Sequence, residues 1–295
     1  MSYLHIDNLY KNTEILLFRE CYALEKCHGS SAHITWNEGE LRFFAGGSKH
    51  AHFVSLFNEE DLREAFLKTG QPKIVVHGEG YGGKLQGMKH TYGPNLRFIA
   101  FDVKVGDVWL SVPQAEILTK ELGLEFVPYV KIPATIEDIN QQRDAPSAIA
   151  KLVGIEGHKI REGVVHRPLI ELTKNNGERV IVKHKRDEFM ETRTPREVDP
   201  TRVAVLDEAQ AIAQEWVTDM RLTHVLDKLP EAKSMQQTSL VVKAMIDDVK
   251  REAGQEVVWS KEAERAIGSA TAALFKQRVP ASIPPVCDQA GVVSE

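Results

Sequence analysis

The amino-acid sequence predicts an α+β fold in which short strands dominate the first two thirds of the chain and helices dominate the remainder. Up to residue 186, apolar residues occur in short runs broken by Gly and Asn, which is typical of strands. After residue 200, apolar residues recur at intervals of three and four, which is typical of helices. We therefore expect sheets with flanking helices in residues 1–195, a small all-helical domain in residues 196–285 and a tail in residues 286–295.

Two predicted helices interrupt the strand-like runs of the first part. Asn58 is a suitable N-cap for a helix over residues 59–69 that Gly70 ends, and Pro113 opens a second helix that ends at Gly123. The predicted strands are SSAHITW (30–36), LRFFA (41–45), KIVVH (73–77), RFIAFDVKV (97–105), VWLSV (108–112), GVVHRPLIEL (163–172) and RVIVKHK (179–185). The segment GEGYGGKL (78–85) has leucine where a phosphate-binding P-loop has Ser or Thr, so we expect a plain loop there.

Three helical segments are predicted after residue 200, and each carries an apolar stripe. Ser260 is a suitable N-cap for the third segment, Pro280 ends it, and the tail from residue 282 is expected to fray. The stripes consist of Leu206, Ala209, Ala213, Trp216 and Met220, then Val241, Ala244, Met245 and Val249, then Ala266, Ile267, Ala270 and Leu274.

The composition is that of an ordinary globular protein, with 42% hydrophobic and 27% charged residues. No apolar run is long enough to span a bilayer, no signal pattern opens the chain, and the three cysteines show no disulfide or metal spacing, so we expect a cytoplasmic location. The net charge of −5 argues against indiscriminate binding of nucleic acid. Residues 151–186, however, hold nine Lys and Arg against four Glu, which suits an enzyme that meets phosphates in one cleft.

The segment LEKCHGSS (24–31) places Lys26 at the end of a predicted strand, directly before Cys27, His28 and Gly29. A lysine is nucleophilic only when neutral, and burial or neighbouring cations are the effects that lower its usual pKa of ~10.4. Apolar strand neighbours supply the first effect. Lys183 and Lys185, which alternate along a strand and so share a face, supply the second. Such a lysine could form a Schiff base with a carbonyl or a phosphoramidate with a nucleoside triphosphate.

Attack on a triphosphate needs companions: carboxylates for a divalent metal, cations for pyrophosphate and an apolar slot for the base. Candidates of each type follow Lys26 in order along the chain. In FIAFDV (98–103), alternation predicts that Phe98 and Asp102 share one face of the strand and Phe101 lies on the other. The ordered candidates are Glu79, Phe101, Asp102, Glu162, Val165, Arg167, Lys183 and Lys185.

The ordered set K-x-x-G, F-D-V, E-G-V-V-x-R-P and K-x-K resembles motifs I, III, IV and V of the covalent nucleotidyltransferase superfamily, which comprises polynucleotide ligases and mRNA capping enzymes. Histidine two residues after the lysine, in EKCHG, resembles the RNA ligase 2-like family of bacteriophage-type ATP-dependent RNA ligases. The resemblance spans residues 24–186. It implies a nucleotidyltransferase domain of antiparallel sheets with flanking helices, ATP with Mg²⁺ or Mn²⁺ as cofactors, RNA as partner, and a host cytoplasm if the gene is phage-encoded.

The resemblance also implies roles for individual residues. Lys26 would become covalently bound to AMP. Glu25 would meet the adenine edge through its backbone, and Glu79 would contact the ribose. Phe101 and Val165 would sandwich the adenine between a flat aromatic face and a small branched side chain.

The remaining motif residues would handle the metal and the phosphates. Glu162 would bind the catalytic metal, Lys183 and Lys185 would hold the ATP phosphates, and Arg167 is the motif IV cation. His28 and Asp102 are implied to be essential without individual roles. Gly29 would permit close backbone approach, and Cys27 stands in the nucleotide-binding run as a tolerated residue.

The sequence departs from the family at one place. Family members carry an Arg-Thr or Arg-Ser pair shortly after motif I, whereas this chain reads LRFFAGGSKH (41–50). Arg42 would have to reach further, or Lys49 would have to substitute.

The function that the resemblance implies is an ATP-dependent RNA ligase, which joins a 3′-hydroxyl to a 5′-phosphate. The three steps are adenylylation of the enzyme, transfer of AMP to the 5′-phosphate, and attack by the 3′-hydroxyl. Two alternatives remain open from the residues alone. The first is a DNA or mixed-strand ligase of the same superfamily, and the second is a nucleotide-binding or RNA-binding module in which the lysine is idle.

Overall fold

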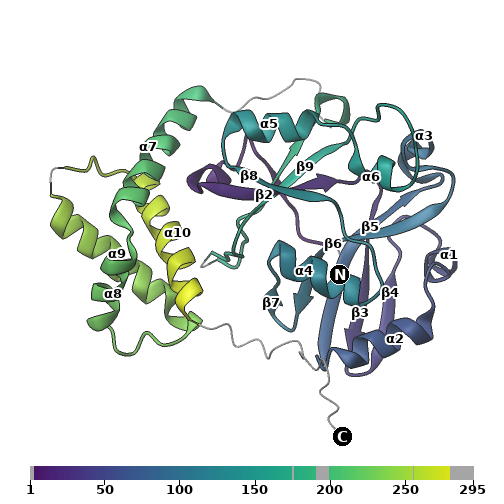
Figure 1. The fold of residues 1–295 in the computed structure, drawn as a ribbon, viewed down its shortest axis with the longest axis horizontal. Coiled ribbons are helices and arrows are strands. Elements are labelled where there is room, and N and C mark those ends of the chain that lie inside the picture. Colours follow the sequence, from purple (N-terminus) through teal and green to yellow (C-terminus); the bar gives the residue numbers. More distant parts are fainter. Residues whose placement is uncertain (1–2, 175, 191–198, 255, 280–295) are drawn as a thin grey trace, which may run out of the picture.

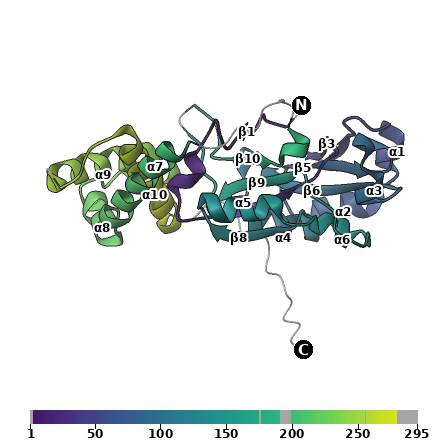
Figure 2. The same ribbon diagram turned by 90° about the horizontal axis from the view of Figure 1, so that it is seen from above.

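The computed structural model describes residues 3–174, 176–190, 199–254 and 256–279, and it confirms the predicted α+β class. Two five-stranded sheets make up the first part of the chain, and the helices from Pro200 to Arg278 gather at one side of them (Figure 1). Seen from above, this helical group extends the molecule along its long axis (Figure 2). No helix among the described residues combines the length and the apolar character needed to cross a membrane.

The first sheet, sheet A, has the strand order β1-β10-β9-β2-β8. Its strands are β1 (Asp7–Asn8), β2 (Glu20–Lys26), β8 (Tyr129–Pro133), β9 (Gly163–Pro168) and β10 (Val182–Lys185). The pairing is antiparallel as the resemblance implied, except that β1 runs parallel to β10. Val165 of β9 lies opposite Leu24 of β2 on one side and opposite Lys183 of β10 on the other. This register brings motifs I, IV and V together.

The second sheet, sheet B, is antiparallel throughout, with the order β4-β3-β5-β6-β7. Its strands are β3 (Ser30–Asn37), β4 (Glu40–Phe44), β5 (Lys73–Gly82), β6 (Leu96–Val105) and β7 (Val108–Trp109). The pairing of β5 with β6 shifts between His77 and Gly78, because His77 lies opposite Asp102 while Gly78 lies opposite Ala100. Phe101 is left without a partner residue, as in a β-bulge.

Six helices accompany the sheets. They are α1 (His50–Val54), α2 (Glu59–Lys68), α3 (Lys89–Tyr92), α4 (Val112–Glu121), α5 (Ile136–Asp144) and α6 (Ala148–Leu152). The predicted cap of α2 is confirmed, since the Asn58 side chain accepts hydrogen bonds from the backbone N–H groups of Glu60 and Asp61.

Local predictions were wrong at several places, and β9 and β10 are shorter than the predicted strands 163–172 and 179–185. Strand β5 continues to Gly82, so most of the expected loop over residues 78–85 is strand, and the short helix α3 follows it. Residues 110–112 are not strand, because Ser111 caps α4 through a capping box with Gln114. Strand β8 and helices α1, α5 and α6 were not predicted.

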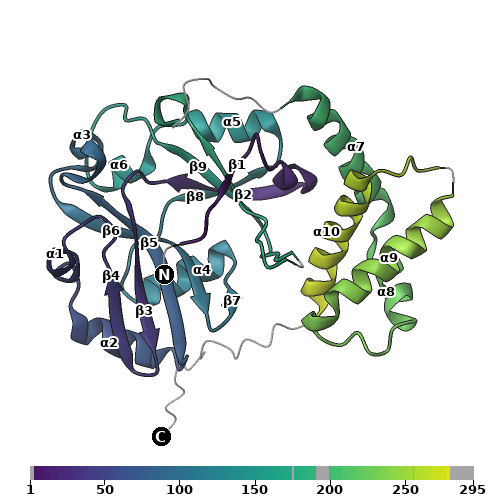
Figure 3. The same ribbon diagram turned by 180° about the vertical axis from the view of Figure 1, so that it is seen from behind.

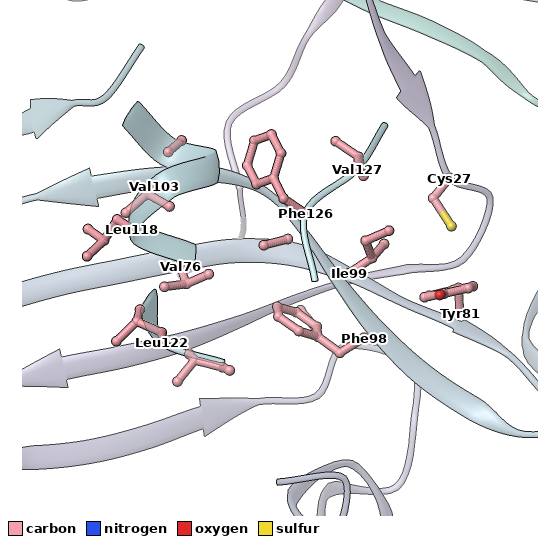
Figure 4. Close-up of a cluster of buried hydrophobic side chains, with 14 of the residues drawn as sticks. Cys27, Val76, Tyr81, Phe98, Ile99, Val103, Leu118, Leu122, Phe126 and Val127 are labelled. Atoms are coloured by element: carbon pink, nitrogen blue, oxygen red, sulfur yellow. The ribbon is translucent and has the colours of Figure 1, made fainter. Parts of the chain in front are cut away.

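The core of the first part lies between sheet B and the helices α2 and α4. Val76 of β5 lies opposite Val103 of β6, and both belong to one buried cluster with Leu118 of α4 (Figure 4). Phe98 belongs to the same cluster and contacts Phe53 of α1 edge-on, with ring centroids 5.6 Å apart. One face of sheet B is therefore covered by helices.

The helical group contains four helices rather than the three predicted segments. They are α7 (Pro200–Trp216), α8 (Asp219–Asp227), α9 (Thr238–Ala253) and α10 (Lys261–Arg278), and the Ser260 side chain caps α10 as predicted. Met220 was wrongly assigned to the stripe of the first segment. The chain leaves helical geometry at Val217, Thr218 caps α8, and Met220 is 71% exposed on that new helix. Pro280 and the tail lie outside the described residues.

The helical group shares its apolar cluster with sheet A. A short 3-10 helix, Glu14–Leu17, places Ile15 and Leu16 among the buried side chains that also include Leu206 and Ala209 of α7. The view from behind shows this turn between the strands and the helical group (Figure 3). Apolar side chains from before and after residue 200 thus pack in one buried cluster. The domain boundary predicted near residue 200 therefore stays a prediction.

Candidate functional site

A pocket of about 410 Å³ opens beside the end of β2, between the two sheets. Side chains from both sheets and from the N-terminal segment line it. Its lining comprises Tyr3, Leu4, His5, Ile6, Leu24, Glu25, Lys26, Cys27, Ser31, Glu79, Phe101, Val127, Val165, Arg167, Ile181 and Lys183. Eight of the residues singled out in the sequence are in this lining: Glu25, Lys26, Cys27, Glu79, Phe101, Val165, Arg167 and Lys183.

Lys26 ends β2, as predicted, and its amine lies against the carboxylate of Glu162 with an Nζ–Oε2 distance of 3.0 Å. His28 Nδ1 approaches the same oxygen at 3.2 Å, and Lys185 Nζ lies 3.0 Å from the other oxygen, Oε1. Three of the residues predicted to be catalytic thus surround a fourth. Glu162 therefore forms ion pairs with both Lys26, the candidate nucleophile, and Lys185 of motif V.

Glu162 remains ionised in this arrangement despite its burial. Its side chain is 1% exposed, and this burial opposes the charged form. The hydrogen bond from His28 and the charges of Lys26 and Lys185 outweigh it and lower the pKa of Glu162 to about 2. The carboxylate is therefore a permanent counter-charge at neutral pH.

Glu79 faces the same space from β5, where it lines the pocket. Burial raises its pKa to about 7, the negative charge of Glu162 acts in the same direction, and Lys26 opposes both. Glu79 accepts a hydrogen bond from the backbone N–H of Gly29 at 3.2 Å. A Cβ atom on Gly29 would lie 2.2 Å from the carbonyl oxygen of Gly80, so the predicted close approach after motif I is confirmed.

The pocket has apolar walls on opposite sheets, formed by Phe101 from β6 and by Val165 from β9. The prediction that Phe98 and Asp102 share a face was wrong. Phe101 and Asp102 both contact Tyr3, whereas Phe98 packs into the helix-covered core. The bulge at Phe101 accounts for the difference, because one extra residue reverses the alternation along a strand.

Asp102 does not touch Lys26 in this structure but lies within a fully buried ionic network. It accepts hydrogen bonds from Arg167 Nη1 at 3.0 Å, from Tyr3 Oη at 2.6 Å and from Arg179. Both arginines also donate to Glu171, and Arg167 donates further to the carbonyl oxygen of Leu110 at 2.6 Å. Burial opposes ionisation of Asp102, but the two guanidinium groups outweigh it and lower its pKa. Tyr3 and Arg167 of this network line the pocket, so the network holds two of the lining side chains in place.

The Glu25 side chain, which was expected to act only through its backbone, ties β2 to α6. Its carboxylate accepts from Ser147 Oγ at 2.5 Å and from the backbone N–H groups of Ala148 at 2.7 Å and Ile149 at 3.2 Å. Burial raises its pKa, and nearby Arg161 partly opposes the change. This anchoring sets the position of the residue before the lysine.

The other sequence candidates have plain positions. Cys27 is buried, and burial raises the pKa of its thiol, which fits a tolerated residue rather than a reactive one. Arg42 forms an ion pair with Glu40 and Lys49 precedes α1, and neither lines the pocket. The structure therefore leaves the residue that replaces the family arginine unassigned.

Sequence reasoning missed Tyr3, Glu171 and Arg179. Arg179 had a usable signal, because it shares its parity with Ile181 and Lys183, which both line the pocket. Glu171 lies four residues after Arg167, a spacing that carries little information outside a helix. Tyr3 had no signal, because only the tertiary fold brings residue 3 to Asp102.

Glu162 was expected to hold a divalent metal. Within the described part of the chain, no three His, Cys, Asp or Glu side chains group together as a metal site would require. A single carboxylate is nevertheless sufficient where substrate phosphates and water supply the other ligands, as is usual for Mg²⁺. The donor set therefore fits a metal that arrives with a nucleotide, and Glu162 is the residue that would hold it.

The two sheets have the nucleotidyltransferase fold, and a strand-end lysine and apolar side chains from both sheets line the pocket between them. The RNA ligase family profile matches residues 19–185, which is more than half of the chain. The chain belongs to the RNA ligase family.

One solved structure supports the fold, and a second from the same organism is similar. A variant of the Naegleria gruberi RNA ligase with ATP and Mn is 16% identical, with a TM-score of 0.50, over 64% of this chain and 57% of that chain. The same organism's RNA ligase with PPi is 18% identical over 65% of this chain and 57% of that chain, with a TM-score of 0.49. The matched region thus spans little more than half the length of those ligases. A comparison with curated protein sequences found no significant match.

Proposed function

We propose that the chain is an ATP-dependent RNA ligase that joins a 3′-hydroxyl end to a 5′-phosphate end through a lysyl-AMP intermediate. The observation that carries the proposal is the position of Lys26. Its amine lies at a pocket of about 410 Å³ that is lined by Phe101 of sheet B and Val165 of sheet A, and Glu162 holds it there at 3.0 Å. The pocket volume and its apolar walls suit a nucleoside, and the amine lies where an α-phosphate would follow.

In the first step, the amine of Lys26 gives up a proton to solvent and attacks the α-phosphorus of ATP. A nitrogen–phosphorus bond forms, the bond from the α-phosphorus to the bridging oxygen breaks, and pyrophosphate leaves. Lys183, which lines the pocket, and Lys185, which lies 3.0 Å from Glu162, would stabilise the charge on the phosphates. Glu79, with a pKa raised to about 7, can donate to or accept from a ribose hydroxyl near neutral pH. A divalent metal would supply charge stabilisation at the phosphates, held by Glu162.

In the second and third steps, the AMP passes to the RNA 5′-phosphate and the 3′-hydroxyl then displaces it. The oxygen of the 5′-phosphate attacks the phosphorus bound to Lys26, and the amine becomes the leaving group. His28 keeps Glu162 oriented through its 3.2 Å contact while Lys26 is engaged with AMP. The 3′-hydroxyl finally attacks the 5′-phosphorus and releases AMP.

We further propose that residues 196–285 act as a domain that positions the RNA ends. The last residue in the chain that we assign to nucleotide binding is Lys185. Among the described residues, none from α7 to α10 lines the pocket. Correct orientation of two ends accelerates joining without any chemistry of its own.

The proposal is tested by incubation of the full chain with α-labelled ATP and a divalent metal, followed by a denaturing gel. A label that stays on the protein supports a nucleotidyltransferase, and its absence would favour a binding module with an idle lysine. Matched nicked duplexes, whose 3′-hydroxyl strand ends in either ribonucleotides or deoxyribonucleotides, then separate RNA from DNA joining. Preferential sealing of the ribonucleotide nick is expected, and equal or reversed preference would favour the DNA ligase alternative.

A further inference from the structure

Five aromatic rings form a continuous row along the face of sheet B that is turned away from α2 and α4. The row runs from Phe44 through His33, His77 and Trp109 to Tyr3. Successive ring centroids are 4.8, 5.7, 5.4 and 5.9 Å apart. We call these five residues the aromatic row. Since antiparallel sheets with one covered face normally place polar residues on the other, a row of rings there calls for a physical reason.

Strand alternation fixes the direction of the row. Phe43 contacts Phe53 and Phe57 on the helix-covered side, so the next residue, Phe44, points to the opposite side. His33 lies opposite Phe44 in the register and stacks on it, with 17° between the ring planes. Ile34, the next residue of β3, is fully buried in the core.

The two ends of the row differ in their surroundings. At the inner end, Tyr3 lines the nucleotide pocket and contacts Phe101 at 4.9 Å. At the outer end, Phe44 is stacked against His33 and yet remains 41% exposed. The row therefore leads from the pocket to an aromatic ring that solvent can reach.

The charges beside the row are already paired. Arg42 forms an ion pair with Glu40, and Lys104, which lies 5.7 Å from the Trp109 ring, forms one with Asp107 at 3.5 Å. Burial lowers the pKa of His77 to about 4, so its imidazole is neutral at physiological pH. Arg179, whose guanidinium lies 4.1 Å from the Trp109 ring centroid, is paired with Asp102 and Glu171. At its exposed end the row therefore offers the uncharged ring face of Phe44 rather than a cluster of cations for phosphates.

We propose that the aromatic row is a stacking surface for unpaired RNA bases, on which one base of the RNA strand entering the site stacks against Phe44. The inference rests on the proposed function, because the RNA strand that receives AMP must reach the pocket at the Tyr3 end of the row, and its neighbouring nucleotides can then lie along the row toward Phe44. Unstacked bases on aromatic side chains are a general mode of RNA recognition, and every base has the required face. A base on Phe44 would extend the existing stack of Phe44 on His33.

The competing explanation is that Phe44 and His33 form only a cross-strand pair that stabilises the sheet. The two explanations differ in one measurable respect. A sheet-stabilising pair has no reason to respond to the presence of a base in the RNA, whereas a stacking surface loses its benefit when the base is removed.

The experiment measures binding of the full chain to a fluorescent single-stranded oligoribonucleotide in the absence of ATP. Wild type is compared with Phe44→Leu, which keeps an apolar contact without a ring, and with Phe44→Trp, which keeps the ring. We expect Phe44→Leu to weaken binding about fivefold or more, as loss of one base–aromatic stack would, and Phe44→Trp to bind like wild type. Leu67→Ala is the matched control. Leu67 is an apolar residue that is 59% exposed, and it lies on α2, on the side of sheet B opposite the aromatic row.

A series of the same RNA with one abasic nucleotide at a time identifies the base. In wild type, one position should show a penalty of about fivefold or more, and Phe44→Leu should remove that penalty. Equal binding of wild type and Phe44→Leu would overturn the inference, as would a loss that is the same for every abasic RNA. If Phe44→Leu does not fold, Phe44→Trp must still show the position-specific penalty, and its absence there and in wild type is equally contradictory.

This test and the test of the proposed function fail separately. A chain that forms the lysyl-AMP adduct but shows no Phe44-dependent penalty refutes the stacking surface alone. A chain that forms no adduct refutes the proposed function, whatever its binding to RNA.

Discussion

Replacement of Glu162 by glutamine should destabilise the protein by ~3 kcal/mol at pH 7. The magnitude follows from the interactions of one buried carboxylate with Lys26, His28 and Lys185, which lower its pKa from 4.5 to about 2. Each pH unit is equivalent to about 1.4 kcal/mol. The value agrees with the ~3–5 kcal/mol lost when one member of a buried ion pair is removed, since Lys26 and Lys185 would lose the carboxylate that they share.

The sign of the pH dependence follows from the same interactions. Because folding lowers the pKa of Glu162, its stabilisation is complete above pH 4.5 and is lost as the pH falls from 4.5 to about 2. The difference in stability between wild type and Glu162→Gln should therefore be constant near neutral pH and shrink in acid.

Urea unfolding of both chains at several pH values measures this difference directly. Glu64→Gln is the matched control. Glu64 lies 4.0 Å from Lys68 on the exposed surface of α2, where an ion pair contributes less than ~1 kcal/mol. A loss below about 1 kcal/mol for Glu162→Gln at pH 7, or a loss that does not shrink in acid, would refute the reasoning.

Three further predictions concern one residue that lines the pocket, Phe101, and two that support the lining, Gly29 and Arg179. Phe101→Ala should raise the ATP concentration needed for adduct formation about fivefold or more by loss of one aromatic stack; unchanged ATP dependence in the folded variant would assign Phe101 to packing alone. Gly29→Ala should lower both the urea midpoint of unfolding and the yield of the AMP adduct, because its Cβ would lie 2.2 Å from a backbone oxygen. Gly80→Ala is the control and should be tolerated, since the nearest atom to its Cβ is 3.5 Å away. Equal effects of the two substitutions would contradict the close approach at Gly29. Arg179→Met should cost about 3–5 kcal/mol in urea unfolding by leaving Asp102 short of a buried partner; a cost near zero would show that the network is redundant.

Much of the fold could be predicted because local patterns and the tertiary structure agree. The alternation in SSAHITW, the Asn58 cap of α2 and the Ser260 cap of α10 are all local features, and the structure contains each of them. Of the predicted strand RVIVKHK, only VKHK is strand. Strand β8, YVKIP, was missed because two of its five residues are polar or proline and its pairing with β2 is tertiary.

Many residues of the candidate site could be predicted from the sequence, but the contacts between their side chains could not. The ordered motifs identified Lys26 and Glu162, yet no spacing indicates that His28 and Lys185 meet the same carboxylate. The alternation rule failed at Phe101, where a bulge changes the direction of the following side chains.

The buried ionic network was beyond sequence reasoning for a related reason. Tyr3, Asp102 and Arg179 are separated by about a hundred and by seventy-seven residues, so only the closed fold brings them together. The helical group shows the converse difficulty. Its stripes were visible, but the break at Val217 between α7 and α8 depends on a backbone change that Trp216 and Met220 do not signal.

The central claim, that Lys26 accepts AMP from ATP and has no part in the final attack by the 3′-hydroxyl, is tested most directly by one comparison. Wild type and Lys26→Ala are each supplied with α-labelled ATP, and separately with RNA that already carries AMP on its 5′ end. The account predicts that Lys26→Ala forms no covalent adduct but still seals the adenylylated RNA, because the amine has no part in the attack by the 3′-hydroxyl. Persistent labelling of Lys26→Ala would contradict the claim.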